Sequence, residues 1–269
     1  MQAATPALAL ANISVTFISD GAARYTAIRD ATLTVRPGEF VSVVGPTGCG
    51  KSTLLNVAAG LLAPSTGDVR VNGEPLAGLN RKAGYLFQSE ALLPWRTALD
   101  NVTVGLEFRG VAREEAVARA ENWLARVGLR GHGHRYPHQL SGGMRKRVAL
   151  AQTLILDPQI ILMDEPFSAL DIQTRQLMEN ELLELWSADR KSVVFITHDL
   201  EEAISLSDRV VVLSAGPESR PIGEFEIDLP RPRDVAEIRL TPHFIELHSR
   251  IWQTMKSEVL KSYEQQKNQ

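Results

Sequence analysis

Apolar and polar residues alternate in the first part of the chain, and this alternation predicts β-strands. The alternating apolar positions are Ile13, Val15 and Phe17 in one segment and Leu33 and Val35 in another. A period of two is typical of a strand with one buried face. The dipeptide Asn72-Gly73 predicts a hairpin turn. We therefore expect an antiparallel β-region near the N-terminus.

Later segments predict strands that alternate with stretches of helical spacing. The predicted strands are Phe40–Val44, Ile160–Met163, Ser192–Thr197 and Val210–Leu213, and Ile160–Met163 is a continuous apolar run. Strands that are buried on both faces of a parallel sheet have this composition. Helical spacing is found in Lys51–Ala59, Asp171–Trp186 and Leu200–Leu206. Strands and helices in alternation predict an α/β fold with a mostly parallel sheet.

Two further regions have helical patterns without strands. Residues 97 to about 135 are rich in Ala, Arg and Glu, and we interpret them as a helical insertion. Near the C-terminus, a helix predicted to begin at about residue 243 carries apolar residues on one face: Phe244, Leu247, Ile251, Met255 and Val259. That face either packs against the core or serves a regulatory contact.

Composition narrows the function classes. The chain has 269 residues, of which 44% are apolar and 23% charged, so it can bury a core and wholesale disorder is excluded. There are 29 Lys and Arg against 32 Asp and Glu, and the net charge of −3 argues against binding a nucleic-acid backbone. The single cysteine, Cys49, excludes an intrachain disulfide. The sequence has neither a membrane-spanning apolar stretch nor a signal-peptide pattern, so we expect a cytoplasmic protein.

The segment Gly45–Ser52 has the pattern G-x-x-x-x-G-K-[ST] and lies between a predicted strand and a predicted helix. Its glycines allow successive backbone N–H groups to point inward, and the helix adds its positive N-terminal end. Lys51 supplies a charge for the β- and γ-phosphates of a nucleotide, and the Ser52 hydroxyl can bind Mg²⁺. The alternative is a tight strand-to-helix turn that merely requires glycine.

Cys49 lies in this loop and has two interpretations. It is either a functional thiol or a small residue that a variable loop position tolerates. In both cases we expect a thiol at a helix N-terminus to be reactive and to be protected by bound nucleotide.

Two acidic residues, Asp164 and Glu165, directly follow the apolar run Ile160–Met163. Such a strand ends at the carboxyl edge of a parallel sheet, where ligands of these folds bind. We expect Asp164 to hold Mg²⁺, directly or through water, and Glu165 to polarise the attacking water. Taken alone, the pair is also consistent with a solvated strand end. The phosphate loop favours the functional interpretation.

The segment Leu140–Met144 predicts a second anion-binding helix start. Apolar residues recur at helical spacing from Met144 to Ile155, which places Ser141 at or near the N-cap. A hydroxyl, two glycine amides and a helix dipole converge there. The alternative is an ordinary capped helix. The sequence lacks a guanine-reading Asn-Lys-x-Asp, which argues against a GTPase.

With these motifs the sequence resembles the ATP-binding cassette family, the nucleotide-binding subunits of ABC transporters, over nearly its whole length. The matching elements are Gly45–Ser52, Gln88, Leu140–Met144, Asp164-Glu165, Ser168-Ala169-Leu170-Asp171 and Thr197-His198-Asp199. The resemblance implies a P-loop NTPase (RecA-like) α/β core with a mostly parallel sheet, an antiparallel β subdomain and an inserted α-helical subdomain. Residues 1–229 would form the nucleotide-binding domain, with the helical subdomain at about 90–158, and residues 230–269 a linker and amphipathic helix.

The resemblance also implies a role for each residue of the site. The catalytic residues would be Lys51, Gln88, Glu165 and His198, and the ligands of Mg²⁺ would be Ser52, Gln88 and Asp164. The nucleotide-binding residues would be Phe17, Gly45, Pro46, Thr47, Gly48, Cys49, Gly50, Lys51, Ser52, Thr53, Gln88 and His198. Phe17 would stack on adenine, and Tyr25 is the second candidate for that role.

Members of the family work as head-to-tail dimers, so the resemblance implies a second ATPase subunit, which is a second copy or a paralogue. Each ATP would lie between Lys51 of one subunit and the signature of the other, which is Leu140, Ser141, Gly142, Gly143 and Met144. Ser168 and Asp171 would lie in a loop at the dimer interface.

Two residues of the signature helix depart from the family pattern. Lys146 stands where the family more often has Gln, and Gln152 stands where it often has Arg. Both changes are polar and leave the Ser-Gly-Gly of the signature intact. We therefore expect them to tune the activity rather than abolish it.

The segment 87–97 contains Leu92-Leu93-Pro94-Trp95, an apolar stretch that is unusual in an exposed loop. Either it faces a partner or Trp95 is buried in the helical subdomain. The segment resembles that of the nitrate/sulfonate/taurine importer ATPases. This resemblance implies two transmembrane permease subunits, an extracytoplasmic solute-binding protein and a peripheral position on the cytoplasmic face of the inner membrane.

Two other function classes compete with an importer subunit. One is a soluble ABC-type ATPase that acts on nucleic acid or ribosomes, and the other is an exporter ATPase. The single cassette and the lack of a basic block argue against the first, and the lack of a fused membrane domain argues against the second. We therefore expect an ATP- and Mg²⁺-dependent importer subunit with no nucleic-acid partner.

Overall fold

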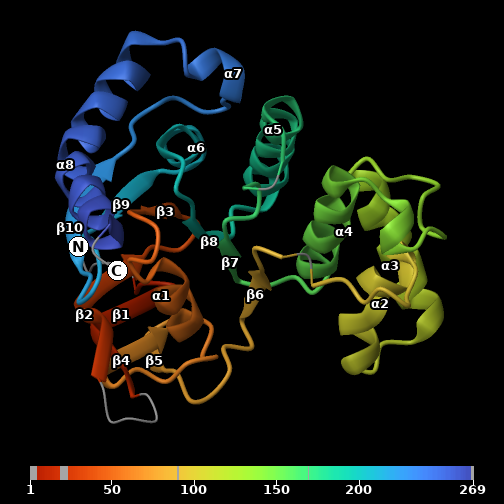
Figure 1. The fold of residues 1–269 in the computed structure, drawn as a ribbon. Helices are drawn as coiled ribbons and strands as arrows, with labels where there is room; N and C mark the ends of the chain where they lie inside the picture. Colours follow the sequence, from red (N-terminus) through yellow and green to blue (C-terminus); the bar gives the residue numbers. More distant parts are fainter. Residues whose placement is uncertain (1–4, 19–23, 90, 169, 268–269) are drawn as a thin grey trace.

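The structure is a computed structural model that describes residues 5–18, 24–89, 91–168 and 170–267 (Figure 1). Glu90 and Ala169, which belong to two of the segments discussed above, lie outside the described residues. The described chain contains two β-sheets and a group of helices that stands on one side of them.

A six-stranded sheet forms the α/β core, with the strand order β10-β9-β3-β8-β7-β6. Its strands are β3 (Phe40–Val44), β6 (Ala83–Leu86), β7 (Ile160–Asp164), β8 (Ser192–Ile196), β9 (Arg209–Leu213) and β10 (Pro221–Glu226). Neighbouring strands pair in parallel, except that β10 runs antiparallel to β9 at one edge. β3, β7, β8 and β9 are buried along their whole length, so the predicted mostly parallel, two-sided sheet is confirmed.

Successive residues of these strands point into two different hydrophobic cores, because the side-chain period of a strand is two. On one face of β7, Ile160 and Leu162 pack with the helix α1 (Lys51–Ala58). On the other face, Ile161 and Met163 pack with α4 (Gly142–Leu154) and α5 (Ile172–Asp189). The strand that ends in the acidic pair is therefore held from both sides.

A second, antiparallel sheet has four strands in the order β2-β1-β4-β5. They are β1 (Leu8–Ile18), β2 (Arg24–Val35), β4 (Thr66–Val71) and β5 (Glu74–Pro75). The expected hairpin joins β4 to β5, and Asn72 and Gly73 in its turn have positive φ angles of 51° and 84°. In the pairing of β1 with β2, Phe17 stands opposite Tyr25.

Three helices lie between β6 and β7 in the chain and group together on one side of the molecule (Figure 1). They are α2 (Ala98–Phe108), α3 (Arg113–Arg126) and α4. The predicted helical region reaches to about residue 135, but α3 ends at Arg126. Residues 127–135 form turns and irregular backbone, because Gly128 and Gly131 adopt φ angles of 70° and 80°. A 3₁₀ turn, Pro137–Gln139, leads into α4.

The C-terminal part of the chain packs back onto the α/β core. It contains α7 (Val235–Ile238) and α8 (Pro242–Lys267), which follow α6 (Leu200–Leu206). The predicted apolar face of α8, including Phe244 and Ile251, is buried in one cluster with residues of α6 and β9. This face therefore serves packing. In the described part of the chain, no helix has the length and apolar content needed to cross a bilayer.

The sequence pattern does not indicate β6 and β10. β6 has four residues and contains Gly84, and β10 alternates half-buried and exposed positions at the edge of the sheet. β6 is too short, and β10 is too polar, for either sequence to show a clear hydrophobic period.

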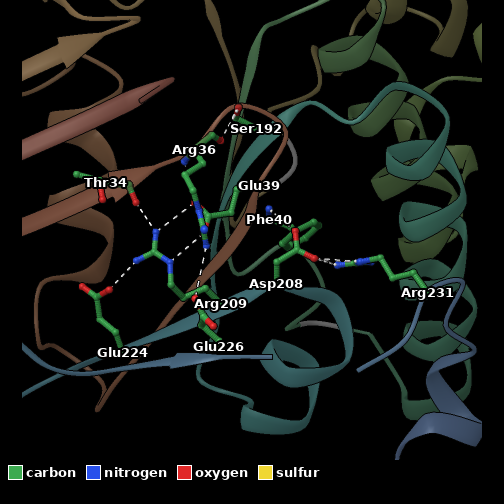
Figure 2. A network of polar contacts seen from close by, with 10 residues as sticks. All are labelled: Thr34, Arg36, Glu39, Phe40, Ser192, Asp208, Arg209, Glu224, Glu226 and Arg231. Carbon is green, nitrogen blue, oxygen red and sulfur yellow. Dashed lines mark hydrogen bonds and ion pairs between the residues drawn. The ribbon is translucent and has the colours of Figure 1, made fainter. Parts of the chain in front are cut away.

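A buried arginine joins the two sheets. Arg209, at the start of β9, is 7% exposed, and its guanidinium donates to Glu39 Oε1 at 2.9 Å and to Glu224 Oε2 at 2.8 Å. It also donates to the carbonyl of Thr34 in β2 (Figure 2). Glu39 in turn accepts the N–H of Arg36 at 2.7 Å. The network therefore connects β2, the turn before β3, β9 and β10.

We expect Arg209→Met to lower the free energy of unfolding by about 3–5 kcal/mol, because it leaves Glu39 buried without its main cationic partner. Burial alone would raise the pKa of Glu39, but hydrogen bonds from Arg209 and Arg36 outweigh burial and hold that pKa below its usual value. The contribution of ionised Glu39 to the free energy of unfolding is therefore fully present above the ordinary pKa of Glu. It is lost as the pH falls through the lowered pKa of Glu39 in the folded protein. Urea unfolding at neutral and acidic pH should show the difference from wild type shrinking on acidification.

The matched control is Arg29→Met. Arg29 pairs with Glu218 at the surface, where the two side chains are 53% and 44% exposed. Exposed ion pairs contribute only about 0–1 kcal/mol. Equal losses of stability in the two variants would contradict the role given to Arg209.

Candidate functional site

The predicted phosphate loop runs from the end of β3 to the start of α1. Gly48 and Gly50 have φ angles of 78° and 94°, which favour glycine. A Cβ on Gly50 would also lie 3.0 Å from the side chain of Ile28. Gly50 is the N-cap of α1, and none of the described side chains caps it. The first amides of α1 are therefore available to an anionic ligand.

Lys51 is the first residue of α1 and is only 6% exposed. Its Nζ donates to the carbonyls of Gly45 and Pro46, at 2.9 and 3.1 Å. These bonds hold the Lys51 side chain over the loop. The ammonium group and the loop amides therefore lie close enough together to bind the same ligand. Charge and N–H donors together are what bind a phosphate group.

Ser52 and Asp164 place two oxygen atoms that can bind a metal ion at the end of the phosphate loop. The Ser52 hydroxyl donates to Asp164 Oδ1 at 3.0 Å, and the Tyr85 hydroxyl lies 3.5 Å from Asp164 Oδ2. Burial raises the pKa of Asp164, and the neighbouring charge of Glu165 raises it further. A buried carboxylate that has hydroxyl neighbours suits a hard divalent cation.

Two side chains meet at one oxygen of Glu165. Gln88 Nε2 donates to Glu165 Oε2 at 3.3 Å, and His198 Nδ1 lies 3.1 Å from the same atom. The backbone of Glu165 has a φ angle of 44°, which a Glu rarely adopts, and its N–H donates to the carbonyl of Ile196 at 2.9 Å. Backbone strain of this kind is characteristic of functional positions.

Lys51, Ser52, Gln88, Glu165 and His198 line one cleft of about 450 Å³. It brings together Phe17, Thr47, Gly48, Gly50, Lys51, Ser52, Thr53, Gln88, Glu165 and His198 from the residues expected at the site. Of the other expected residues, Gly45, Pro46, Cys49 and Asp164 are buried and are not among the lining residues.

Both aromatic candidates border the cleft. Phe17 and Tyr25 are cross-strand neighbours and are 44% and 48% exposed. Each ring therefore has a free face that can stack on a nucleobase, and both stay candidates for that role.

The expectation of a reactive thiol at Cys49 is wrong. Cys49 is 1% exposed, and burial raises its pKa against a smaller opposing effect of the Lys51 charge. Its side chain belongs to the hydrophobic core under the antiparallel sheet. The thiol therefore fills space behind the loop, where the N-terminal end of α1 does not activate it.

The signature segment lies apart from this cleft. Ser141 caps α4 as predicted, and its Oγ accepts the N–H of Met144 at 3.3 Å. None of the residues Leu140–Met144 lines the cleft. The capped start of α4 thus lies outside the cleft of the same chain.

The loop before α5 contacts the back of the site. The Ser168 hydroxyl donates to the carbonyl of Glu165 at 3.0 Å. Asp171 caps α5, with its Oδ1 accepting the N–H of Thr174 at 3.0 Å. Both residues expected in the dimer loop therefore make local contacts that fix the loop.

Two residues that the motifs did not single out also hold the site together. Tyr85 bonds to Asp164, and Arg175 donates to the Leu170 carbonyl at 3.1 Å and to Asp199 at 3.2 Å. Arg175 therefore ties the loop before α5 to the segment that carries the histidine. Its position one helical turn after Asp171 is the only sequence signal that could have indicated it.

The apolar segment before α2 has Trp95 on its surface. Trp95 is 72% exposed, so the interpretation that buries it in the helical subdomain is wrong. The fully buried Asn101 side chain accepts the Leu93 N–H at 2.7 Å and donates to the Leu93 carbonyl at 3.1 Å. The exposed indole is therefore presented on a fixed stretch of backbone.

Comparisons with known proteins show the family of the chain. The ABC transporter family model matches residues 28–168. The chain is 48% identical to an uncharacterized ABC transporter ATP-binding protein of Methanocaldococcus jannaschii, over 89% of this chain and 88% of the relative. The chain belongs to the ABC transporter family.

Two further relatives have names that include a transported solute. The nitrate import ATP-binding protein of Synechococcus elongatus is 40% identical over 91% of this ABC cassette, which spans 37% of that protein. The taurine import ATP-binding protein of Yersinia pestis is 45% identical over 71% of this chain and 75% of its own length.

A solved structure confirms the fold. A dimeric ATP-binding cassette in a post-hydrolysis state, bound to ADP and Pi, matches with a TM-score of 0.74 and 34% identity. The match covers 83% of this chain and 100% of that one. The chain is thus an ABC-type ATPase that binds ATP, with the P-loop α/β fold expected from its motifs.

We expect Cys49 of the native ABC cassette to react with N-ethylmaleimide about 100-fold more slowly than Cys49 of the denatured chain, because local opening must first expose the thiol. Mass spectrometry follows the adduct. Thr47→Cys in a Cys49→Ala background is the control, because Thr47 is exposed in the same loop. Equal rates at the two positions would refute the buried thiol.

Proposed function

We propose that the chain is the ATP-hydrolysing subunit of an importer for a small solute of the nitrate/sulfonate/taurine type. The observation that carries this proposal is the similarity to nitrate and taurine import ATP-binding proteins over most of this chain. The subunit would sit on the cytoplasmic face of the cell membrane against two permease subunits. A solute-binding protein on the other side would deliver the solute.

The exposed segment around Trp95 supports a permease partner. An indole that is 72% exposed on a fixed stretch of backbone is unfavourable in water and favourable in an interface. In this proposal, residues 1–229 form the nucleotide-binding domain with a helical subdomain at about 90–158, and residues 230–269 form the linker and C-terminal helix.

The cleft has the groups needed for in-line transfer of the γ-phosphoryl group to water. Lys51 and the loop amides would bind the β- and γ-phosphates, and Glu165 would accept the proton of the attacking water. The bond between the γ-phosphorus and the bridging oxygen breaks, leaving ADP and phosphate. Gln88 and His198, which both contact Glu165 Oε2, would hold the carboxylate in position.

Ser52, Asp164 and Gln88 fit a bound Mg²⁺. The Ser52 hydroxyl and the Asp164 carboxylate lie 3.0 Å apart, and burial raises the pKa of Asp164, so a bound cation would offset the cost of burying its charge. When bound, Mg²⁺ would neutralise the charge on the phosphate oxygens.

The separation of the two helix starts supports a head-to-tail homodimer. Ser141 caps α4 but does not line the chain's own cleft. In the proposed dimer, the signature of one copy would close the cleft of the other. The dimeric state of the cassette that matches in structure supports this arrangement.

We expect Glu165→Gln to bind ATP nearly as wild type does and to lose about 100-fold or more in hydrolysis rate, because the amide cannot accept the proton. Phosphate release measures hydrolysis, and light scattering measures ATP-driven dimerisation of the trapped variant. Glu114→Gln, at the start of α3, is the control and should hydrolyse at the wild-type rate. Hydrolysis by Glu165→Gln at the wild-type rate would exclude Glu165 as the base.

We expect Trp95→Ala to weaken co-purification with the permease subunits and to reduce solute uptake about tenfold, because it removes an anchor side chain. Phe108→Ala is the matched control, since Phe108 is an even more exposed aromatic residue, at 88%, at the end of α2. Uptake and membrane co-purification unaffected by Trp95→Ala would contradict the docking role. ATPase stimulation by nucleic acid would favour the competing class.

A further inference from the structure

Lys146 is a buried lysine that bonds to the backbone of a residue in the catalytic cleft. It lies on α4 and is 3% exposed. Its Nζ donates to the carbonyl oxygen of Gln88 at 2.5 Å. Lysine is rarely buried to this extent, and a short charge-assisted bond offsets part of the cost of removing its charge from water. The contact therefore fixes the position of the buried ammonium group relative to Gln88.

The two ends of this contact belong to different parts of the ATPase site. Five positions before Lys146, Ser141 caps the same helix, about 7.5 Å away along a rigid axis. On the other side, the Gln88 side chain donates to Glu165 Oε2 at 3.3 Å. A continuous path of bonds thus runs from the start of α4 through Lys146 and Gln88 to Glu165.

We propose that Lys146 is a positioning residue that transmits the state of the signature to the general base of the same chain. Engagement of Ser141 with the partner's nucleotide would shift α4, and Lys146 would move the Gln88 backbone with it. Glu165 would then be aligned only when the signature is engaged. The inference rests on the proposed function, because it requires two copies around ATP.

The rest of α4 is anchored without Lys146, so its substitution is compatible with folding. Arg147, the next residue, pairs with Glu181 of α5 at 2.7 Å and donates to the Val127 carbonyl at 3.3 Å. Met matches the length of the lysine stem, so Lys146→Met removes the N–H donor with little change in volume. Replacing a buried charge by an apolar side chain of similar size is often neutral for stability.

The test compares three variants in ATP hydrolysis by the full chain. We expect Lys146→Met to lower kcat about tenfold at little-changed KM, because a small displacement of the base slows the chemical step. The Hill coefficient for ATP should fall from about 2 towards 1, because the coupling between the two sites is lost. Lys146→Gln, which keeps an N–H donor without the charge, should restore most of kcat and of the Hill coefficient.

Gln152→Met is the control, because it makes the same apolar replacement further along α4 at a half-buried position. It should keep the wild-type kcat and Hill coefficient. Hydrogen exchange adds a structural readout: the amides of residues 86–89 should exchange faster in Lys146→Met than in Gln152→Met.

Three results would overturn the proposal. They are wild-type kinetics in Lys146→Met, the same loss in Gln152→Met, and a Lys146→Gln variant as slow as Lys146→Met. A lower melting temperature with an unchanged Hill coefficient would assign Lys146 a structural role and likewise reject the proposal. Failure of the proposed function gives a different result. In that case Glu165→Gln would hydrolyse ATP at the wild-type rate.

Discussion

Three parallel strands end at the same edge of the central sheet, and the groups around the cleft are anchored at those ends. β3 leads into the phosphate loop, β7 ends at Asp164, and β8 is followed by the segment that carries His198. The register pairs Val43 with Ile196 and Ile196 with Asp164, so the three ends are level. Because a slip of one residue would reverse the side chains of a strand, this register fixes which groups face the cleft.

Two buried carboxylates lie in opposite environments. At the junction of the sheets, Glu39 is surrounded by cationic donors, and its pKa is lowered despite burial. At the end of β7, burial raises the pKa of Asp164, and the charge of the neighbouring Glu165 raises it further. The first arrangement is complete within the chain, whereas the second favours the arrival of positive charge. The same fold thus separates a structural carboxylate from one suited to ligand binding.

Much of the fold and of the site could be predicted from local sequence. The apolar run of β7, the glycine pattern of the phosphate loop and the N-cap at Ser141 each have a short-range physical cause. The burial of Cys49 and the paths through Arg175 and Lys146 could not be predicted, because they depend on side chains that meet only after the sheets and helices pack. The edge strand β10 is also missed, because its more buried positions include Pro221 and Gly223, so no apolar alternation is visible in its sequence.

The Phe17–Tyr25 pair has a consequence for which nucleotide the cleft accepts. The two rings stand opposite each other on β1 and β2 and offer flat apolar faces at the mouth of the cleft. Every purine and pyrimidine has a π-face, so a contact made by ring stacking discriminates poorly among them. Discrimination between adenine and guanine requires donors and acceptors aimed at the edge of the base, and stacking supplies none. If base binding rests on this stacking, as the proposed function has it, recognition would be weighted towards the triphosphate, and the cleft would tolerate other nucleoside triphosphates.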